Sequence, residues 1–434
     1  MSVSGRLAEE LERTLYAIAG LPIAIHGAWS APTPAARDIR RAFARRFWRP
    51  DNFRDAFELV AGIALAPIVV PLAALWFTAR NGPAIRRRDR KGILAQFGEQ
   101  LWLYGSAGIL GPWYYILSLH REGRSRAPTF LQRCETKRGI YAMLKGGEAS
   151  PLGQKQAFAE RCQEAGVRCV ACEQLIDGSA VNPTDLPDCD LFVKPLVGCG
   201  GKGAERWDRV APRRWSDGTL ELGDGALVDH LRTRRRPLVV QKRIKPHSAL
   251  EPLTSGATPT VRALTIINEQ GIPELVAAVF RMSFGANRTV DNIHAGGLAC
   301  AVSLVDGCLG KASDLGTDAR LGWVSEHPTT GARIEGTRLP CWDQVGPLAV
   351  AAHALFSDRL VIGWDIAIAE GGPIIIEGNR GPDMDLMQRF MEIGFCHHRF
   401  GELIAWHLRE RGYVTGAAGA ASGWSMTRMD TQRQ

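Results

Sequence analysis

The stretch that decides the fold is the pair of segments Gly363-Trp364-Asp365-Ile366-Ala367-Ile368 and Pro373-Ile374-Ile375-Ile376-Glu377-Gly378-Asn379. Both read as strands rich in β-branched residues, and the turn Glu370-Gly371-Gly372 joins them, so they are predicted to pair as a β-hairpin. This pairing brings the carboxylates of Asp365 and Glu377 and the amide of Asn379 onto facing segments. Such oxygen ligands suit Mg²⁺, which completes its shell with water and nucleotide phosphate.

A second informative segment lies upstream and ends in a glycine-rich loop. It runs Asp190-Leu191-Phe192-Val193-Lys194-Pro195 and continues as Leu196-Val197-Gly198-Cys199-Gly200-Gly201-Lys202-Gly203. An apolar strand thus delivers Lys194 to the loop. Gly200 and Gly201 let backbone N–H groups turn toward phosphate oxygens, and Lys202 adds positive charge. The loop is not a P-loop, because Gly203 stands where a Ser or Thr is needed. We interpret it as a hairpin lid over phosphates, with a plain glycine turn as the alternative.

Further segments, in chain order, complete a pattern that resembles the ATP-grasp superfamily, whose members bind Mg-ATP between two α+β lobes. They are a helix that opens at Gly153-Gln154-Lys155, two strands at 238–244 and 260–265, and a loop at 287–297 that follows Arg281. The resemblance covers roughly residues 135 to 412. The chain looks most similar to the sugar-transfer-associated ATP-grasp group, and the loop after Arg281 resembles that of amino-acid-adding (glutamate) ligases.

The resemblance implies how this chain would bind the nucleotide. Lys155 and Lys194 correspond to the two lysines that reach the ATP phosphates. The implied ligands of one or two Mg²⁺ ions are Asp365, Glu377 and Asn379. The implied hinge residues at the adenine edge are Gln241, Lys242 and Ile244. Lys242 replaces the usual Glu of the family, so the resemblance supports backbone contacts to the base and leaves a side-chain contact in doubt.

The residue types also suggest the chemistry. Attack of a carboxylate on the γ-phosphate of ATP gives an acyl phosphate, which an amine or similar nucleophile then displaces, and charge neutralisation with positioning drives such transfers. Bidentate guanidinium groups suit a carboxylate or the developing acyl phosphate. The expected catalytic residues are Arg262, Arg281, Arg288 and Asn292. Arg262 as an ordinary ion-paired arginine, and Asp291 in an Asx turn or as a direct ligand, remain open.

The prediction is therefore an α+β protein with an ATP-grasp domain at 126–412, a mainly helical region at 1–125 before it, and a disordered tail at 413–434. The resemblance implies an ATP-dependent carboxylate–amine ligase acting on a small-molecule or glycan-linked carboxylate in polysaccharide biosynthesis. A kinase of a sugar-like hydroxyl and a nucleotide-binding scaffold are the alternatives. The retained lysines and Mg²⁺ ligands argue against the scaffold. The sequence does not specify the acid, the acceptor or the oligomeric state.

Residues 59–77 of the N-terminal region carry no charge. As a helix they would be about 28 Å long, close to the thickness of a bilayer core, and Pro67 and Pro71 are expected to kink it. Basic residues lie on both sides, between 40 and 91, which fits poorly with a simple span. The pattern favours a re-entrant or monotopic helix on the cytoplasmic leaflet. A buried helical hairpin is the alternative.

A second uncharged stretch at 101–119 is broken by glycines and Pro112, so it is predicted to pack within the protein, with a second span as the alternative.

The net charge of +8 is concentrated around the apolar segment, and we expect no nucleic-acid partner. Ten cysteines without a disulfide framework indicate a reducing compartment. Cys169 and Cys172 are expected in a buried strand rather than at zinc, and 396–398 is expected to be structural, on a C-terminal helix.

Overall fold

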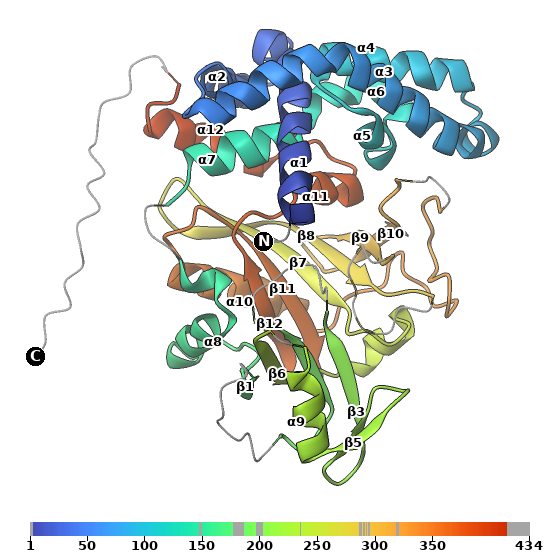
Figure 1. Ribbon diagram of the computed structural model, residues 1–434, viewed down its shortest axis with the longest axis vertical. Coiled ribbons are helices and arrows are strands. Elements are labelled where there is room, and N and C mark those ends of the chain that lie inside the picture. Colours follow the sequence, from blue (N-terminus) through green and yellow to red (C-terminus); the bar gives the residue numbers. More distant parts are fainter. Residues whose placement is uncertain are drawn as a thin grey trace, which may run out of the picture.

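The computed structural model describes residues 3–414 except 147–149, 177–185, 197–202, 235, 286–288, 290, 292, 294–295 and 318–320, with side chains described from residue 11 on. A layer of helices lies across one end of the molecule, a large antiparallel sheet lies beneath it, and a smaller sheet forms the opposite end (Figure 1). The predicted α+β class with a helical N-terminal region is confirmed. Most of the expected tail at 413–434 lies outside the described residues.

The helical layer is built mainly from the first part of the chain. Its elements are α1 (Val3–Pro22), η1 (Ile23–Gly27), α2 (Pro34–Phe47), α3 (Phe53–Asp89), α4 (Ile93–Ala107), α5 (Gly111–Ile116), α6 (Leu119–Arg126), η2 (Ala127–Thr129), η3 (Glu135–Ile140) and α7 (Tyr141–Met143). Side-chain caps fix two of the starts. Thr33 Oγ1 accepts from the Ala36 amide at 3.0 Å before α2, and Asn52 Oδ1 accepts from the Asp55 amide at 3.0 Å before α3, each satisfying a donor that the first helical turn leaves open.

The apolar segment at 59–77 forms part of the single helix α3, which continues through Pro67, Pro71 and Pro83. Only 22% of its most apolar window is buried, so the buried-hairpin alternative is wrong. The stretch at 101–119 does not form one helix: α4 ends at Gly108, whose φ of +68° suits glycine. Residues such as Tyr114 and Ile116 are buried in the layer, in agreement with the predicted packing.

The smaller sheet has the order β1-β6-β2-β3-β4-β5 and is antiparallel throughout. Its strands are β1 (Gln174–Ile176), β2 (Leu191–Pro195), β3 (Glu205–Ala211), β4 (Arg214–Ser216), β5 (Glu221–Gly223) and β6 (Leu238–Lys242), with α9 (Asp224–Arg232) packed on one face. β3 pairs with β2 as the return strand that the sequence predicted after the glycine-rich loop. Trp207 and Trp215 are fully buried in its core.

The larger sheet has the order β10-β9-β8-β7-β11-β12 and is also antiparallel. Its strands are β7 (Thr260–Ile267), β8 (Pro273–Met282), β9 (Leu298–Val302), β10 (Leu309–Ser313), β11 (Val361–Ala369) and β12 (Gly372–Asn379). The remaining elements are η4 (Pro151–Gly153), α8 (Lys155–Glu164), η5 (Ser248–Leu253), α10 (Trp342–Leu355), α11 (Met384–Met391), η7 (Phe395–His397) and α12 (Arg399–Glu410).

The two faces of the larger sheet bury different cores. One face packs Trp364 with Phe158 of α8 and Ala349 of α10. The other face packs Leu264 and Ile266 of β7 under α2, α11 and α12. Because alternate residues of a strand share a face, Thr260 and Arg262 lie on this second face too, beyond the edge of the apolar contacts. The face that the helices cover at one end therefore becomes polar at the other.

The region around Cys396 corrects a detail of the sequence interpretation. Cys396 is buried, and His398 caps α12 by accepting from the Phe400 amide through Nδ1 at 3.2 Å. The residues have the structural role that was expected. They precede the C-terminal helix, however, and do not lie on it.

Candidate active site

Strand register brings the predicted Mg²⁺ ligands and two of the predicted arginines together. Asp365 of β11 lies opposite Arg262 of β7 on one side and opposite Glu377 of β12 on the other. Arg281 of β8 lies opposite Thr260. Since alternate residues share a face, one face carries the set Arg281, Thr260, Arg262, Asp365, Glu377 and Asn379. A β-bulge follows Asp365 in its pairing with β12, a feature that often re-aims side chains beside active sites.

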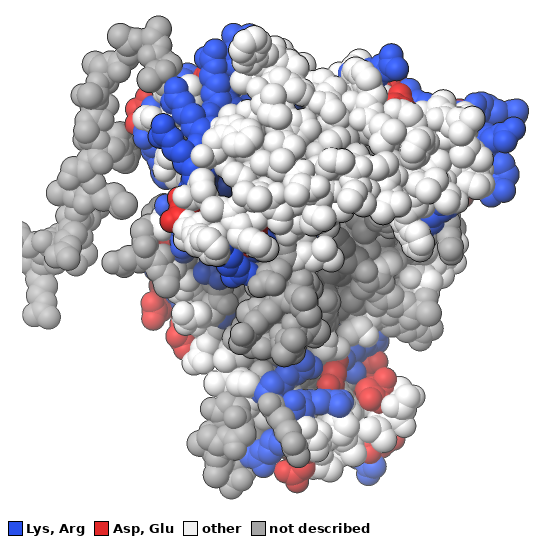
Figure 2. All heavy atoms as spheres, turned by 45° about the horizontal axis from the view of Figure 1, so that its top comes forward, with Lys and Arg blue, Asp and Glu red and all other residues white. Residues whose placement is uncertain are grey.

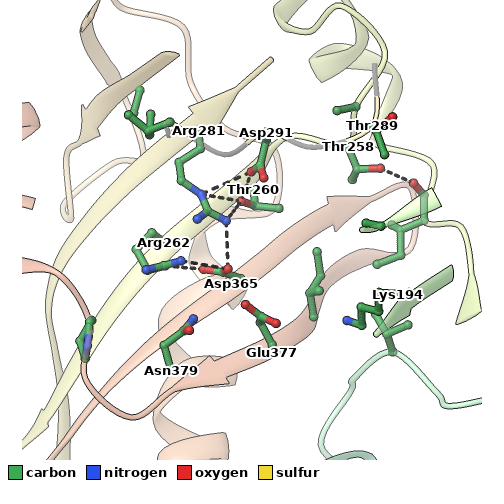
Figure 3. A pocket seen from close by; sticks show the side chains of 18 of the residues that line it. Lys194, Thr258, Thr260, Arg262, Arg281, Thr289, Asp291, Asp365, Glu377 and Asn379 are labelled. Atoms are coloured by element: carbon green, nitrogen blue, oxygen red, sulfur yellow. Dashed lines mark hydrogen bonds and ion pairs between the residues drawn. The ribbon is translucent and has the colours of Figure 1, made fainter. Parts of the chain in front are cut away.

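Arg262 and Arg281 both contact Asp365 (Figure 3). Arg262 makes a bidentate pair, with Nη2 donating to Oδ2 at 3.0 Å and Nε donating to Oδ1. Arg281 Nη2 lies 3.0 Å from the same Oδ2. Burial disfavours the charged carboxylate, but the two guanidinium groups outweigh burial and hold the pKa of Asp365 at about 2. Asp365 is thus a fixed anion that orients two arginines at the cavity.

Arg281 also joins Thr260 and Asp291. Its Nε and Nη2 donate to Thr260 Oγ1 at 3.0 and 2.6 Å, and its Nε lies 3.4 Å from Asp291 Oδ2. Thr260 Oγ1 donates to Asp291. Burial raises the pKa of Asp291, against the lowering effect of Arg281. Asp291 therefore makes tertiary contacts with Thr260 and Arg281. The sequence had left its role open between an Asx turn and a direct ligand.

The donor set on β11 and β12 fits a magnesium ion. No group of three or more His, Cys, Asp or Glu side chains that could hold a metal is found within the described part of the chain, so the set here is two carboxylates and one amide. Nδ2 of Asn379 is buried without a hydrogen-bond partner among the described residues. Because amide N and O placements are interchangeable, Oδ1 can take that position. Mg²⁺ binds proteins through one or two carboxylates and keeps several waters.

Lys194 of the smaller sheet and Lys155 of α8 line the same cavity as this set. Figure 3 shows Lys194 of β2 pointing across the gap toward Glu377. Lys194 is only 8% exposed. Burial lowers its pKa, the carboxylate of Glu377 opposes this, and the charge of Lys155 adds to the lowering. Lys155 opens α8 and donates from Nζ to the Leu196 carbonyl at 3.0 Å, so it lies where the glycine-rich loop begins.

The predicted hinge residues line the same cavity. Gln241 is buried and donates from Nε2 to the Ala171 carbonyl at 3.3 Å. The Lys242 side chain is 61% exposed and lies 3.6 Å from Glu173. The carbonyl of Ile244 accepts from Thr258 Oγ1 at 2.7 Å. The predicted residues Gly200, Gly201, Lys202, Arg288 and Asn292 lie outside the described residues.

The cavity has a volume of about 820 Å³ and lies between the two sheets and the helical layer. Its end near the hinge is lined by apolar side chains, including Val170, Phe192 and Ile376. Its other end carries the arginines and the carboxylates. A cleft of this size with an apolar end and convergent polar groups is typical of small-molecule sites.

Sequence reasoning missed two basic residues of the cavity, Arg133 and Lys137. Lys137 Nζ contacts Asp383 Oδ1 at 2.8 Å and donates to the Gly381 carbonyl at 2.7 Å. Arg133 Nη2 lies 3.5 Å from Asp383. Their spacing of four residues places them on one side of a helix, which the sequence shows. No local sequence pattern, however, indicates that they approach residues near 381–383.

The residues after β12 divide between the cavity and the core. Asp383 lines the cavity and makes no side-chain cap at α11. The pKa of Asp383 is lowered, because Lys137 and Arg133 outweigh the opposing effect of burial. Gln388 is buried and structural: its Oε1 accepts from the Leu131 and Phe395 amides at 2.9 and 2.8 Å.

Comparison with known proteins gives a family match over the part of the chain that carries the arginines and carboxylates of this site. Residues 226–398 match the family model described as sugar-transfer associated ATP-grasp. This part of the chain is similar to the ATP-grasp domains of that family. The match includes the hinge strand β6, the arginine strands β7 and β8, and the hairpin of β11 and β12. A search of curated proteins gave no match.

Solved structures show distant likenesses. D-alanine–D-alanine ligase from Bacillus anthracis, complexed with ATP, is 12% identical at a TM-score of 0.34, covering 61% of this chain and 68% of that one. L-amino acid ligase from Bacillus licheniformis is 10% identical at 0.32, covering 57% and 48%. The biotin carboxylase domain of 2-oxoglutarate carboxylase from Hydrogenobacter thermophilus, with MgADP and bicarbonate, is 14% identical at 0.33, covering 59% and 45%. At TM-scores of 0.32 to 0.34, these likenesses support no conclusion about this chain.

Proposed function

We propose that the protein is a Mg-ATP-dependent ligase that activates a carboxylate as an acyl phosphate and transfers the acyl group to an amine or similar nucleophile. The observation that carries this proposal is the arrangement within one cavity. Lys155 and Lys194 line this cavity together with Glu377 and Asn379, and Arg262 and Arg281 line it from the larger sheet. The ATP-grasp family match supports nucleotide-dependent ligation.

The lysines are proposed to bind the phosphates of ATP. The buried Lys194 ammonium is already close to the Lys155 ammonium and the Glu377 carboxylate, and an anionic phosphate between the two cations would relieve their repulsion. Gln241, Lys242 and Ile244 would hold the adenine at the apolar end of the cavity. Asp365, Glu377 and Asn379 would hold one or two Mg²⁺ ions, which neutralise phosphate charge during transfer.

Arg262 and Arg281 are proposed to hold the acid substrate. Arg262 keeps 20% of its side chain exposed and lines the cavity, and a guanidinium fork matches a carboxylate. The substrate oxygen attacks the γ-phosphorus as the bond to the β–γ bridging oxygen breaks, which releases ADP. The amine nitrogen then attacks the carbonyl carbon, phosphate leaves, and the nitrogen loses a proton. Arg288 and Asn292 would complete this end of the site.

One feature of the site favours the ligase over the kinase alternative. A hydroxyl nucleophile needs a base that accepts its proton. Both oxygens of Asp365 accept from arginines, and Asp291 accepts from Thr260. A carboxylate nucleophile has no proton to lose. Asp365 and Asp291 are therefore better arranged for charge organisation than for general-base catalysis.

The biological setting is proposed from the family match and the N-terminal region. The description of the matched family, sugar-transfer associated, supports a role in polysaccharide or glycan biosynthesis with a glycan-linked or small carboxylate. ATP is a cytoplasmic nucleotide, so the catalytic domain would face the cytoplasm.

The test is a product assay. The purified protein is incubated with Mg-ATP, a panel of amino acids and sugar acids, and hydroxylamine, and is followed for ADP, phosphate and hydroxamate. ADP release together with a hydroxamate from one acid is the expected result. ADP release with a phosphorylated hydroxyl product and no hydroxamate would overturn the ligase in favour of the kinase. Tight Mg-ATP binding without turnover across the panel would favour a nucleotide-binding scaffold.

A further inference from the structure

Helix α3 exposes a long apolar surface that no part of the described chain covers. We name the α3 face by its exposed residues, which are Phe53, Phe57, Val60, Ile63, Leu65, Ile68, Leu72, Leu75 and Trp76. Ile68 is 58% exposed, Leu72 59% and Trp76 66%. Apolar patches of this extent on a soluble surface mark interaction sites. The fraction buried, 22% of the most apolar window, is also far below that of a core helix.

The opposite side of α3 is packed against the protein through small residues. A Cβ on Gly62 would meet the Ala17 Cβ at 2.7 Å, so α1 approaches the α3 backbone closely. Further along, Thr78 Oγ1 accepts from Gln100 Nε2 of α4 at 2.6 Å. The helix is therefore docked along its length, with one side committed to the protein and the other side exposed.

Both ends of α3 are held by the same body of the protein. At its start, Arg138 of η3 pairs with Asp55 at 3.0 Å and Glu58 at 2.9 Å. At its end, Arg88 Nη1 donates to the Leu321 carbonyl, beyond β10 of the larger sheet, at 3.3 Å. A helix of 37 residues is about 55 Å long, well beyond the bilayer core of about 30 Å. A spanning helix would place these two ends on opposite sides of the membrane, where one domain cannot contact both.

The surroundings of the α3 face carry positive charge. Exposed arginines lie on α2 and just before α3, namely Arg41, Arg45 and Arg49, and others lie at its far end, namely Arg86, Arg87 and Arg90. Figure 2 shows a broad uncharged surface over the helical layer, bordered by Lys and Arg on both sides. Trp29 and Trp48 are also exposed on this layer. Apolar residues with basic and tryptophan borders are the composition of helices that lie in a lipid interface.

We propose that the α3 face binds an anionic lipid bilayer in the plane of the membrane, on one leaflet and without crossing it. The apolar side chains enter the headgroup and upper acyl region, and the arginines at both ends contact anionic headgroups. The occupant is a lipid surface and not another protein, because basic residues that can meet anionic headgroups lie at both ends of one continuous apolar helix. The proposal goes beyond the ligase reaction and does not depend on it.

The binding test uses the full-length protein and sedimentation with vesicles of phosphatidylcholine, with or without phosphatidylglycerol. Leu72→Glu combined with Ile68→Glu should weaken binding to the anionic vesicles by about tenfold or more. The matched control is Ile272→Glu, because Ile272 is 56% exposed in the turn between β7 and β8, and it should bind as the parent does. Thermal unfolding of each variant checks the fold, which exposed positions should preserve.

The orientation test places a cysteine at each end of α3, Asp51→Cys and Arg87→Cys, in protein bound to sealed vesicles. A membrane-impermeant maleimide added outside should label both sites, as read by mass spectrometry of the two peptides. Labelling of one end only would show a span and overturn the proposal. Failure to bind either vesicle would also overturn it. If the protein instead self-associates in light scattering and the Leu72 and Ile68 substitutions abolish that association, the occupant is a second copy.

Discussion

Two clusters in this molecule consist of arginines and carboxylates, but one lines the cavity and the other connects helices. At the cavity, Arg262 and Arg281 converge on Asp365. Under α3, Arg138 bridges Asp55 and Glu58, which Arg13 also contacts. The first cluster is built across neighbouring strands and opens into the cavity. The second ties three helical segments together.

The comparison teaches that ion pairing alone does not identify a functional site. Both clusters contain carboxylates whose pKa is lowered by arginines against the opposing effect of burial. What distinguishes the cavity cluster is what lies beyond it: Glu377, Asn379 and Lys194 on the rim of the same space. A lowered pKa therefore marks a paired carboxylate, and the neighbours decide whether the pair can serve a ligand.

The largest expected effect is on the rate of ADP release, and it comes from substitution of Glu377 and Asn379. Glu377→Gln combined with Asn379→Ala should reduce Mg-dependent ADP release by at least about 10³-fold, since the remaining carboxylate, Asp365, is already engaged by arginines. The unfolding temperature should change little, because neither side chain holds the core. Measured turnover within tenfold of the parent would remove these two residues from the metal site.

Asp365→Asn is expected to act on both stability and activity. It keeps the shape and removes the charge that faces Arg262 and Arg281, which leaves two part-buried cations without their common partner. Loss of one member of a buried ion pair costs about 3 kcal/mol or more. Denaturant unfolding measures the loss of stability, and ADP release under conditions where the variant is folded measures the loss of activity. A variant of normal stability would show that the cavity cluster is not tightly coupled.

Lys194→Ala tests the opposite wall of the cavity. The affinity for ATP should fall by about 10²-fold, because a buried cation that would face phosphate is lost. Isothermal titration calorimetry gives the affinity directly. The matched control is Lys311→Ala, which removes an exposed lysine of β10 and should bind ATP as the parent does. Equal affinities for the two variants would contradict the proposed phosphate contact.

His353 offers a pH test on the other face of the larger sheet, away from the cavity. It contacts Thr265 Oγ1 through Nδ1 at 2.6 Å and the Arg359 carbonyl through Nε2 at 2.8 Å. Burial lowers the pKa of His353 from its usual 6.5 to about 4. Between these two pKa values the unfolded chain binds a proton at His353 and the folded protein does not. The contribution of His353 to the free energy of unfolding is therefore fully present above the unfolded pKa and is lost as the pH falls from 6.5 toward 4.

The expected loss from this one group is about 2 kcal/mol between pH 7 and pH 5. Urea unfolding of the parent and of His353→Gln, repeated at both pH values, isolates it, because the variant keeps hydrogen-bonding groups and does not titrate. Between pH 7 and pH 5, the free energy of unfolding of the variant should fall by about 2 kcal/mol less than that of the parent. Parallel profiles would show that His353 carries no such linkage.

The smallest expected effect belongs to the cluster under α3. Arg138→Ala should cost about 1 kcal/mol of stability, because its side chain is 29% exposed and Arg13 still faces the same carboxylates. ADP release per folded molecule should stay unchanged. An activity loss comparable to that of Asp365→Asn would erase the distinction between the two clusters.

The sequence predicted the parts of the site that local pattern controls. The hairpin around Asp365 and Glu377 followed from two strands and a glycine turn, and strand alternation then fixed which side chains share a face. The position of Lys194 at the end of a short apolar strand was equally readable. These predictions needed only residues that are close in sequence.

The parts that escaped prediction depend on contacts between distant segments. Lys137 reaches the Gly381 carbonyl across 244 residues, and no local pattern specifies that approach. The extent of α3 was also underestimated: the uncharged stretch at 59–77 is the centre of a helix from Phe53 to Asp89. Its caps and its basic end were visible in the sequence, but Pro67 and Pro71 were expected to kink the helix. Docking against α1 and α4 supports it instead.

The alternation along β7 has a consequence for quality control in the cell. Leu264 and Ile266 of β7 stabilise the core on the same face where Thr260 and Arg262 serve the cavity. A slip of one residue in the pairing of β7 would turn all four side chains to the other face. A misregistered chain would lose its core and its chemistry together, and the exposed apolar residues would mark it for chaperones and proteases. We therefore do not expect a stably folded form of this sheet in which the cavity residues are misplaced.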